Sequence, residues 1–361
     1  MAMKRSREKR DDNISRGLQR TARRKPLQGL LSTGIVPLNL AMSDTVHGGI
    51  SEGEIINIVG DSQAGKSMLA LSMLAELAIT DKYSNYKIIY DDVEFAAKFD
   101  VGDLFGEALD ERMVIKNSNT IQDYVAEMER LFKNKEKFIY VLDSLDSITT
   151  DEEIERFGKQ LASKDSGKEE NVLGKTMGME RAKYMSMLLR RFRGSLMQSN
   201  SFLIVVSQLR DNTDAANPFS PKDKRVGGRA LQFYCAHVVW LYRQSFIKKK
   251  VDGKLIRIGS DVLAKVSKNK LTGKQRDVGI NIYEDLGVDN TQAMIDLLLE
   301  TNYWEKVNGR VKAAEFDTTL RANDLVQFIE DGNHEPKLAE ICGEAWHLRE
   351  EKLKLGRKRR Y

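Results

Sequence analysis

One eight-residue segment constrains the possible fold of this chain more than any other. It reads Gly60-Asp61-Ser62-Gln63-Ala64-Gly65-Lys66-Ser67 and matches the phosphate-binding pattern GxxxxGK[ST] at every specified position. An apolar run rich in β-branched residues, 54–59, precedes it, and a stretch with helical periodicity, 66–79, follows it. A strand, a glycine-containing loop and a helix in this order wrap the phosphates of a nucleotide, so the sequence predicts an ATP-binding site formed by all eight residues.

The residue types in this segment suit nucleotide chemistry. Backbone N–H groups of the loop would surround the phosphates, and the N-terminus of the following helix would add partial positive charge. The Lys66 ammonium would reach the β and γ phosphates, and the Ser67 hydroxyl would hold Mg²⁺. An ordinary glycine turn is the alternative interpretation, and the strand and helix on either side argue against it.

Carboxylates follow two further apolar runs, at positions that a nucleotide-hydrolysing site requires. Run 138–143 ends at Asp143, from which a carboxylate reaches Mg²⁺, usually through water. Another run ends near Asp91, and Glu94 follows where a carboxylate could activate the attacking water. Any of Asp91, Asp92 and Glu94 could instead be a solvated residue at the end of a strand.

Apolar runs and helical stretches alternate along most of the chain. The predicted strands are 54–59, 87–91, 138–143, 201–207 and 237–242, and the clearest predicted helices are 66–79 and 120–133. Two later runs, 260–267 and 275–283, predict a hairpin with its turn at 271–274. The alternation predicts an α/β fold with a mostly parallel, twisted sheet flanked by helices.

Basic residues gather at both ends of the chain. The whole chain has 58 Lys and Arg against 53 Asp and Glu, a net charge of +5, so only clustering makes the excess important. We expect three parts: a basic N-terminal arm at 1–30, the core at 31–310, and a small helical C-terminal region at 311–361 that ends in a basic tail. Such ends bind phosphates or stay solvated.

Composition also excludes several classes of protein. The two cysteines, Cys235 and Cys342, permit neither a disulfide framework nor a CxxC zinc site, which favours a reducing setting. No apolar run approaches the roughly 18 residues that cross a bilayer. The N-terminus lacks the apolar segment of a signal peptide. We therefore expect a cytoplasmic protein with no membrane partner.

Four further segments carry a resemblance to a known family. They are 32–41 with the glycine pair Gly48-Gly49 after it, 197–210, 227–234 (GGRALQFY) and 265–270 (KVSKNK). With the phosphate-binding loop, they make the chain resemble the RecA-type DNA strand-exchange recombinases over 31–310, including their bacteriophage branch. The resemblance implies a RecA-like P-loop ATPase core with ATP and Mg²⁺ as cofactors.

The resemblance also implies roles for four residues outside the loop. Glu94 aligns with the family's catalytic carboxylate, and Gln208 with the glutamine that senses the γ-phosphate and orders the loop after it. Lys268 and Lys270 resemble the lysines that complete the ATP site of a neighbouring subunit. From the sequence alone, these two lysines are simply solvated cations beside a turn.

Two charged segments without regular periodicity, 151–178 and 211–226, are the predicted DNA-binding loops. Basic side chains bind phosphates without reading sequence, and an aromatic ring can pack against bases. For any single lysine, a solvated surface position is the alternative. The candidate contacts are Lys175, Arg181, Phe219, Lys222, Lys224, Arg225, Gly227 and Gly228.

The chain departs from the family in three places. Only a short basic arm stands where bacterial members have an N-terminal module that docks on the next subunit. The C-terminus is basic, at 357–360, where those members tend to be acidic. Gln232 replaces a basic residue at one subunit contact. How protomers interlock is therefore not predicted.

The resulting expectation is an ATPase that forms helical filaments on single-stranded DNA and exchanges strands with a homologous duplex. Its expected partners are both DNAs, other copies of itself, and single-strand-binding and mediator proteins. A ring-forming DNA helicase with the same core is one alternative, and an ATP-binding recombination mediator without strand exchange is another. A P-loop enzyme acting on small molecules would leave the two basic loops unexplained.

Overall fold

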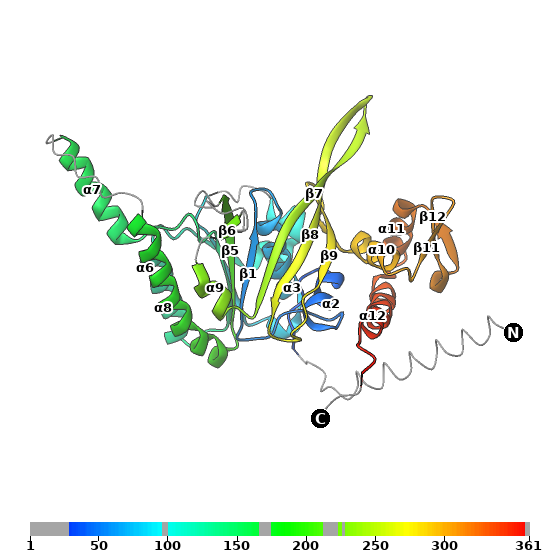
Figure 1. Ribbon diagram of the computed structural model, residues 1–361, viewed down its shortest axis with the longest axis horizontal. Coiled ribbons are helices and arrows are strands. Elements are labelled where there is room, and N and C mark those ends of the chain that lie inside the picture. Colours follow the sequence, from blue (N-terminus) through cyan, green and yellow to red (C-terminus); the bar gives the residue numbers. More distant parts are fainter. Residues whose placement is uncertain (1–28, 96–99, 166–174, 212–222, 226–227, 358–361) are drawn as a thin grey trace.

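The computed structural model describes residues 29–95, 100–165, 175–211, 223–225 and 228–357, and describes only the backbone at 160–165, 175–183, 210–211, 223–225 and 228–230. A central sheet forms the body, and two helices extend from one side of it (Figure 1). A two-stranded ribbon projects from another side, and the C-terminal elements form a separate group beyond the sheet (Figure 1). The predicted α/β class is confirmed.

The main sheet has ten strands among the described residues. They are β1 (Ile55–Gly60), β2 (Lys87–Asp92), β3 (Met113–Lys116), β4 (Phe138–Asp143), β5 (Phe202–Asp211), β6 (Asp223–Arg225), β7 (His237–Val251), β8 (Lys254–Asn269), β9 (Asp277–Tyr283) and β10 (Gly287–Asp289). Their order is β10-β9-β8-β7-β1-β5-β4-β2-β3, with β6 paired to β5. Strands from β7 to β3 in this order pair in parallel, and β8, β9 and β10 add antiparallel pairs.

Helices cover both faces of the sheet. They are α2 (Val36–Ser43), α3 (Lys66–Ile79), α4 (Val101–Phe105), α5 (Glu107–Arg112), α6 (Ile121–Lys133), α7 (Asp151–Asp165), α8 (Lys175–Ser199), α9 (Gly228–Tyr234), α10 (Asn290–Glu300), α11 (Ala322–Asp331) and α12 (Glu335–Lys352), with short 3-10 turns η1 (Asp81–Tyr83) and η2 (Ala314–Phe316). None of the helices in the described part of the chain is long and apolar enough to cross a bilayer.

The alternation of side chains along β2 and β4 builds two separate cores. Ile88, Tyr90, Ile139 and Val141 belong to the core that contains α3. Ile89, Phe138, Tyr140 and Leu142 belong to the core that contains α6 and α8. Because successive strand residues point to opposite faces, an all-apolar run such as 138–143 fills both cores at once.

Local sequence determines where the covering helices begin. Thr120 caps α6, since its side chain accepts a hydrogen bond from the Asp123 backbone N–H at 3.2 Å. The Asp123 carboxylate in turn accepts from the Thr120 backbone N–H at 3.0 Å. This reciprocal cap satisfies two backbone donors that the first turn leaves without a helical partner.

The predicted elements differ from the structure most at β7, at β8 and in the segment 151–178. The predicted runs 237–242 and 260–267 are the inner parts of β7 and β8, which continue outward as a long ribbon. The ribbon's outer residues are mostly exposed and lack a buried face, so they show no strand-like hydrophobic pattern. The segment 151–178, expected to be a loop, instead contains α7 and the start of α8.

The C-terminal region contains a sheet as well as the expected helices. Strands β11 (Glu305–Val307), β12 (Arg310–Ala313) and β13 (Thr318–Leu320) pair antiparallel. These strands have only three or four residues each, too few for a periodic pattern to be recognised in the sequence. The predicted boundary near residue 310 therefore falls inside this small sheet.

A partly buried group of charges joins α12 to the core. Lys274 lies 2.8 Å from both Asp44 Oδ2 and Glu350 Oε2, and Arg276 Nε donates to Glu350 at 2.6 Å. Trp346 Nε1 donates to Asp44 at 3.1 Å. Burial acts to raise the pKa of Glu350, but the hydrogen bonds from Arg276 and Lys274 outweigh it and lower the pKa to about 2.

Candidate active site

The phosphate-binding loop lies where β1 ends and α3 begins, at the carboxyl edge of the parallel strands. Its glycines are required by the space around them. A Cβ at Gly65, where φ is +87°, would lie 2.2 Å from Ile282 Cδ1, and a Cβ at Gly60 would lie 2.8 Å from the Leu241 carbonyl oxygen. The loop can therefore approach β7 and β9 closely only without these side chains.

Lys66 lies inside this loop and is almost fully buried, at 7% exposed. Its Nζ donates to the Asp61 carbonyl oxygen at 2.7 Å. Burial lowers the pKa of Lys66, while the charges of Asp143 and Glu94 act in the opposite direction. The predicted phosphate-binding cation thus sits among the predicted carboxylates.

The two predicted magnesium residues are in direct contact. Ser67 Oγ donates to Asp143 Oδ2 at 2.5 Å. Burial raises the pKa of Asp143, and the hydrogen bonds that it accepts act against that rise. A hydroxyl and a carboxylate oxygen are hard ligands of the kind that Mg²⁺ takes, so this pair fits the metal that the phosphate-binding loop implies.

Sequence reasoning missed Tyr90, whose hydroxyl donates to the same Asp143 Oδ2 at 2.5 Å. Burial raises the pKa of Tyr90, and the Asp143 charge raises it further, so the hydroxyl keeps its proton and acts as a donor. In the sequence, Tyr90 looks like one more apolar strand residue. The usable signal was the two-residue period, which puts Tyr90 on the same face of β2 as Asp92.

Glu94 accepts three hydrogen bonds on one carboxylate oxygen. The donors to Oε1 are Ser144 Oγ at 2.6 Å, Ser147 Oγ at 2.8 Å and Gln208 Nε2 at 2.7 Å. The structure therefore brings the predicted catalytic carboxylate and the predicted γ-phosphate sensor together. The Gln208 backbone N–H also donates to the Asp146 carboxylate.

Asp91 takes no part in this group, although it adjoins Asp92 and Glu94 in sequence. It is fully buried and accepts hydrogen bonds from Tyr140 Oη at 2.5 Å and from Ser118 N and Oγ at 2.8 and 2.7 Å. Asp91 is therefore not a solvated residue at a strand end. It stabilises the sheet on the face away from α3.

Lys268 and Lys270 lie at one end of the strands, and the phosphate-binding loop of the same chain lies at the other end. Ile56, near the start of β1, is opposite His237 of β7. His237 is in turn opposite Asn269, the last residue of β8. Both lysines instead contact carbonyl oxygens at the end of α9, with Lys268 Nζ 2.9 Å and Lys270 Nζ 3.2 Å from the Phe233 oxygen. Within one chain, the two lysines are therefore not part of the predicted ATP site.

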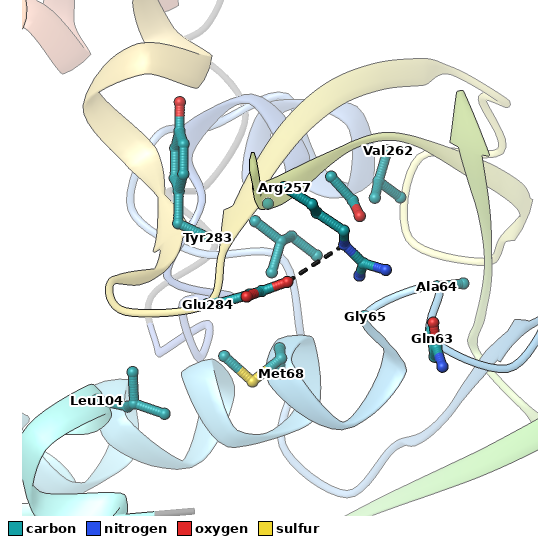
Figure 2. Close-up of a pocket in the computed structure, with 12 residues that line it drawn as sticks. Gln63, Ala64, Gly65, Met68, Leu104, Arg257, Val262, Tyr283 and Glu284 are labelled. Atoms are coloured by element: carbon teal, nitrogen blue, oxygen red, sulfur yellow. Dashed lines mark ion pairs between the residues drawn. The ribbon is translucent and has the colours of Figure 1, made fainter. Parts of the chain in front are cut away.

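A pocket opens beside the phosphate-binding loop, and sequence reasoning did not find it. Met68, Leu104 and Val262 line it with apolar atoms (Figure 2). Ile282 is a further apolar residue of the lining. The charged residues at the pocket are Arg257 from β8 and Glu284 after β9, paired at 3.2 Å (Figure 2). Its walls come from positions 63–68, from α4, and from β8, β9 and the residue after β9, which are far apart in the chain.

The predicted DNA contacts are described only in part. Phe219, Lys222 and Gly227 lie outside the described residues, and of the other candidates only the backbone is described. These backbone positions are Lys175 and Arg181 in α8, Lys224 and Arg225 in β6, and Gly228 at the start of α9. Strand β6 pairs with the end of β5, immediately after Gln208.

Comparison with known proteins decides the family. The family model described as RecA N-terminal domain matches residues 17–289, well over half of the chain. This chain belongs to the RecA family. The match confirms the family inferred from the sequence, and it includes the phosphate-binding loop, both carboxylates and Gln208.

Several curated proteins named Protein RecA are similar to this member of the family. The one from Oleidesulfovibrio alaskensis is 26% identical over 277 residues, covering 77% of this chain and 71% of that protein. The one from Chlamydia muridarum is 27% identical over 310 residues, covering 83% and 80%. The one from Brucella canis is 26% identical over 340 residues, covering 86% and 85%. These relatives are bacterial, and they do not test the predicted bacteriophage branch.

Proposed function

We propose that this RecA-family protein is a DNA-dependent ATPase that forms filaments on single-stranded DNA and exchanges strands with a homologous duplex. The observation that carries the proposal is the contact between Glu94 and Gln208 beside the phosphate-binding loop. Gln208 lies on β5, and the same strand continues to the pairing with β6. One strand thus links the nucleotide site to the predicted second DNA-binding loop.

Nucleotide binding would use the contacts already described. The loop 60–67 would hold the phosphates through its backbone N–H groups, and Lys66 would turn from the Asp61 oxygen toward them. Ser67 and Asp143 would hold Mg²⁺, which when bound neutralises charge on the transferred phosphate. The pocket lined by Met68 and Ile282 would take the adenine base, because it is apolar and adjoins the loop.

Hydrolysis would begin from a Glu94 that is hydrogen-bonded by Gln208, Ser144 and Ser147. A γ-phosphate offers Gln208 a stronger, charged acceptor for its amide. Once Gln208 turns to the phosphate, Glu94 accepts one hydrogen bond fewer and can orient the attacking water. The movement of Gln208 would shift β5 and its β6 partner, which is how nucleotide binding would order the loop.

Filament formation would place Lys268 and Lys270 at the ATP site of the neighbouring protomer. What supports this is their position at the end of the strands opposite their own loop. A contact between one end of the sheet in one protomer and the other end in the next protomer is head-to-tail. Such a contact builds a helical filament when the rotation between neighbouring protomers does not close into a ring. Basic residues of the two predicted loops would bind the DNA backbone, and base pairing would select the homologous duplex. Single-strand-binding and mediator proteins would act with it, in the cytoplasm of a bacterium or of a bacteriophage-infected cell.

The test is ATP hydrolysis with and without single-stranded DNA, followed by electron microscopy with a slowly hydrolysed ATP analogue. We expect strong stimulation by the DNA and open helical filaments. Closed rings would indicate a helicase. Binding of ATP without stimulation would indicate a recombination mediator.

A further inference from the structure

The Asp143 carboxylate is held by two hydroxyl groups from two different elements. Ser67 at the start of α3 and Tyr90 in β2 both donate to Oδ2, each at 2.5 Å. The Ser67 contact belongs to the phosphate-binding loop. The Tyr90 contact is independent of that loop, because β2 lies on the far side of β4 from β1.

The position of the Tyr90 hydroxyl is determined by the sheet. Tyr90 is opposite Val141, and Asp92 is opposite Asp143, in the parallel pair of β2 and β4. Tyr90 is 2% exposed and packs in the core that contains α3. A tyrosine ring packed in this way has little rotamer freedom, so its hydroxyl stays in place whether or not the loop moves.

We propose that Tyr90 is a positioning residue for the magnesium site, an inference that rests on the proposed function. Its hydroxyl holds Asp143 in one side-chain conformation before nucleotide and metal arrive. A carboxylate held in advance loses less conformational freedom on binding, and hydrogen-bonding partners behind a metal ligand raise metal affinity for this reason. Tyr90 acts only through Asp143 and is not itself a ligand.

The same two strands provide a matched control on their other face. Tyr140 donates to Asp91 at 2.5 Å, and Asp91 is also bonded to Ser118. Both tyrosines are nearly or fully buried and each donates to a carboxylate. Replacing either by phenylalanine removes one buried hydroxyl from the same pair of strands, but only Tyr90 contacts the predicted magnesium residue.

The experiment measures the affinity of the full chain for a fluorescent, non-hydrolysable ATP analogue across a series of Mg²⁺ concentrations and in EDTA. Mg²⁺ should increase the affinity for the analogue, and the Mg²⁺ concentration that gives half of this increase should be about tenfold higher in Tyr90→Phe. Loss of a hydrogen-bonding partner behind a metal ligand typically has an effect of this size. The affinity of Tyr90→Phe in EDTA should match that of the unaltered chain. Tyr140→Phe should leave the Mg²⁺ dependence unchanged, although unfolding experiments should show that it also loses stability.

Three results would overturn the proposal. Equal shifts in the two variants would show a general effect of weakening β2 and β4, and an unshifted Tyr90→Phe would show that the hydroxyl does not position Asp143. An unaltered chain that binds the analogue equally with and without Mg²⁺ would remove the magnesium site itself, and with it the proposed ATPase. The first two results leave the proposed function standing.

A second measurement does not require loss of the hydroxyl. Site-specific incorporation of 3-fluorotyrosine at the positions of Tyr90 and Tyr140 gives two fluorine NMR signals in an otherwise unchanged protein. Adding Mg²⁺ to the complex with the ATP analogue should move the signal at Tyr90 and leave that at Tyr140 in place. A signal at Tyr90 that does not respond to Mg²⁺ would contradict the proposal even if Tyr90→Phe failed to fold.

Discussion

At the scale of single residues, the site is built from donors that converge on two carboxylates. Asp143 accepts from Ser67 and Tyr90, and Glu94 accepts from Ser144, Ser147 and Gln208. Because a carboxylate with several donors keeps a fixed orientation, the proposed function implies a site that is ordered before nucleotide binds. The roles of these residues follow from which carboxylate each one holds.

Replacing the Glu94 carboxylate by an amide should separate hydrolysis from binding. Glu94→Gln cannot accept a proton from water, so DNA-stimulated phosphate release should fall by roughly 100-fold or more. Filaments with ATP should still form and should last longer. Glu305→Gln, on the exposed strand β11, is the control. Undiminished turnover in Glu94→Gln would refute the catalytic assignment.

Gly65, the second glycine of the phosphate-binding loop, should lose stability when it gains a side chain. Gly65→Ala combines a positive φ, which costs a non-glycine residue about 1–2 kcal/mol, with a clash against Ile282. Gly273→Ala has a similar φ of +75° and nothing within 4 Å of the new Cβ. Urea unfolding should therefore show a larger loss of stability in Gly65→Ala than in Gly273→Ala. Equal losses would mean that the loop has room to relax.

At the scale of elements, the hydrophobic pattern of the sequence predicts helices and strands that are buried and misses those that are exposed. Helix 66–79 and strand 138–143 were predicted to the residue, because their side chains pack in the cores. The outer ribbon of β7 and β8 was missed because its strands are held mainly by backbone pairing in solvent. The contact of Glu94 with Gln208 was not predictable from spacing, since it depends on the order of strands in the sheet.

The attachment of α12 to the core should depend on pH through Glu350. Its pKa is lowered to about 2 in the folded state, so its stabilisation is fully present above the ordinary glutamate pKa and is lost as pH falls toward 2. Because Lys274 and Arg276 are partly exposed, solvent screening reduces the energy that the shift implies, and Glu350→Gln should cost about 1–2 kcal/mol at neutral pH. Unfolding free energies measured from pH 7 down to pH 2 should converge for the two proteins. Glu351→Gln, an exposed neighbour, should show no such convergence; a constant difference for Glu350→Gln would contradict the assignment.

At the scale of the whole molecule, the ATP site is incomplete within one chain if Lys268 and Lys270 act on a neighbour. Two variants that are inactive alone should then recover ATP turnover when they are mixed. A protomer with Lys268→Ala and Lys270→Ala still carries Glu94, and a Glu94→Gln protomer still carries both lysines. An equimolar mixture should recover about a quarter of normal turnover, the fraction of head-to-tail interfaces that combine the two intact halves. A mixture as inactive as its components would place the lysines outside the neighbour's site.

An assay of strand exchange measures the proposed recombinase activity itself. A fluorescence assay would follow transfer of a labelled strand from a duplex to a single strand coated with this protein and ATP. We expect transfer with a homologous duplex, little with an unrelated one, and none with Lys66→Ala. If ATP hydrolysis is stimulated by single-stranded DNA but no strand is transferred to the homologous partner, the chain is a DNA-dependent ATPase of the RecA family and not a recombinase.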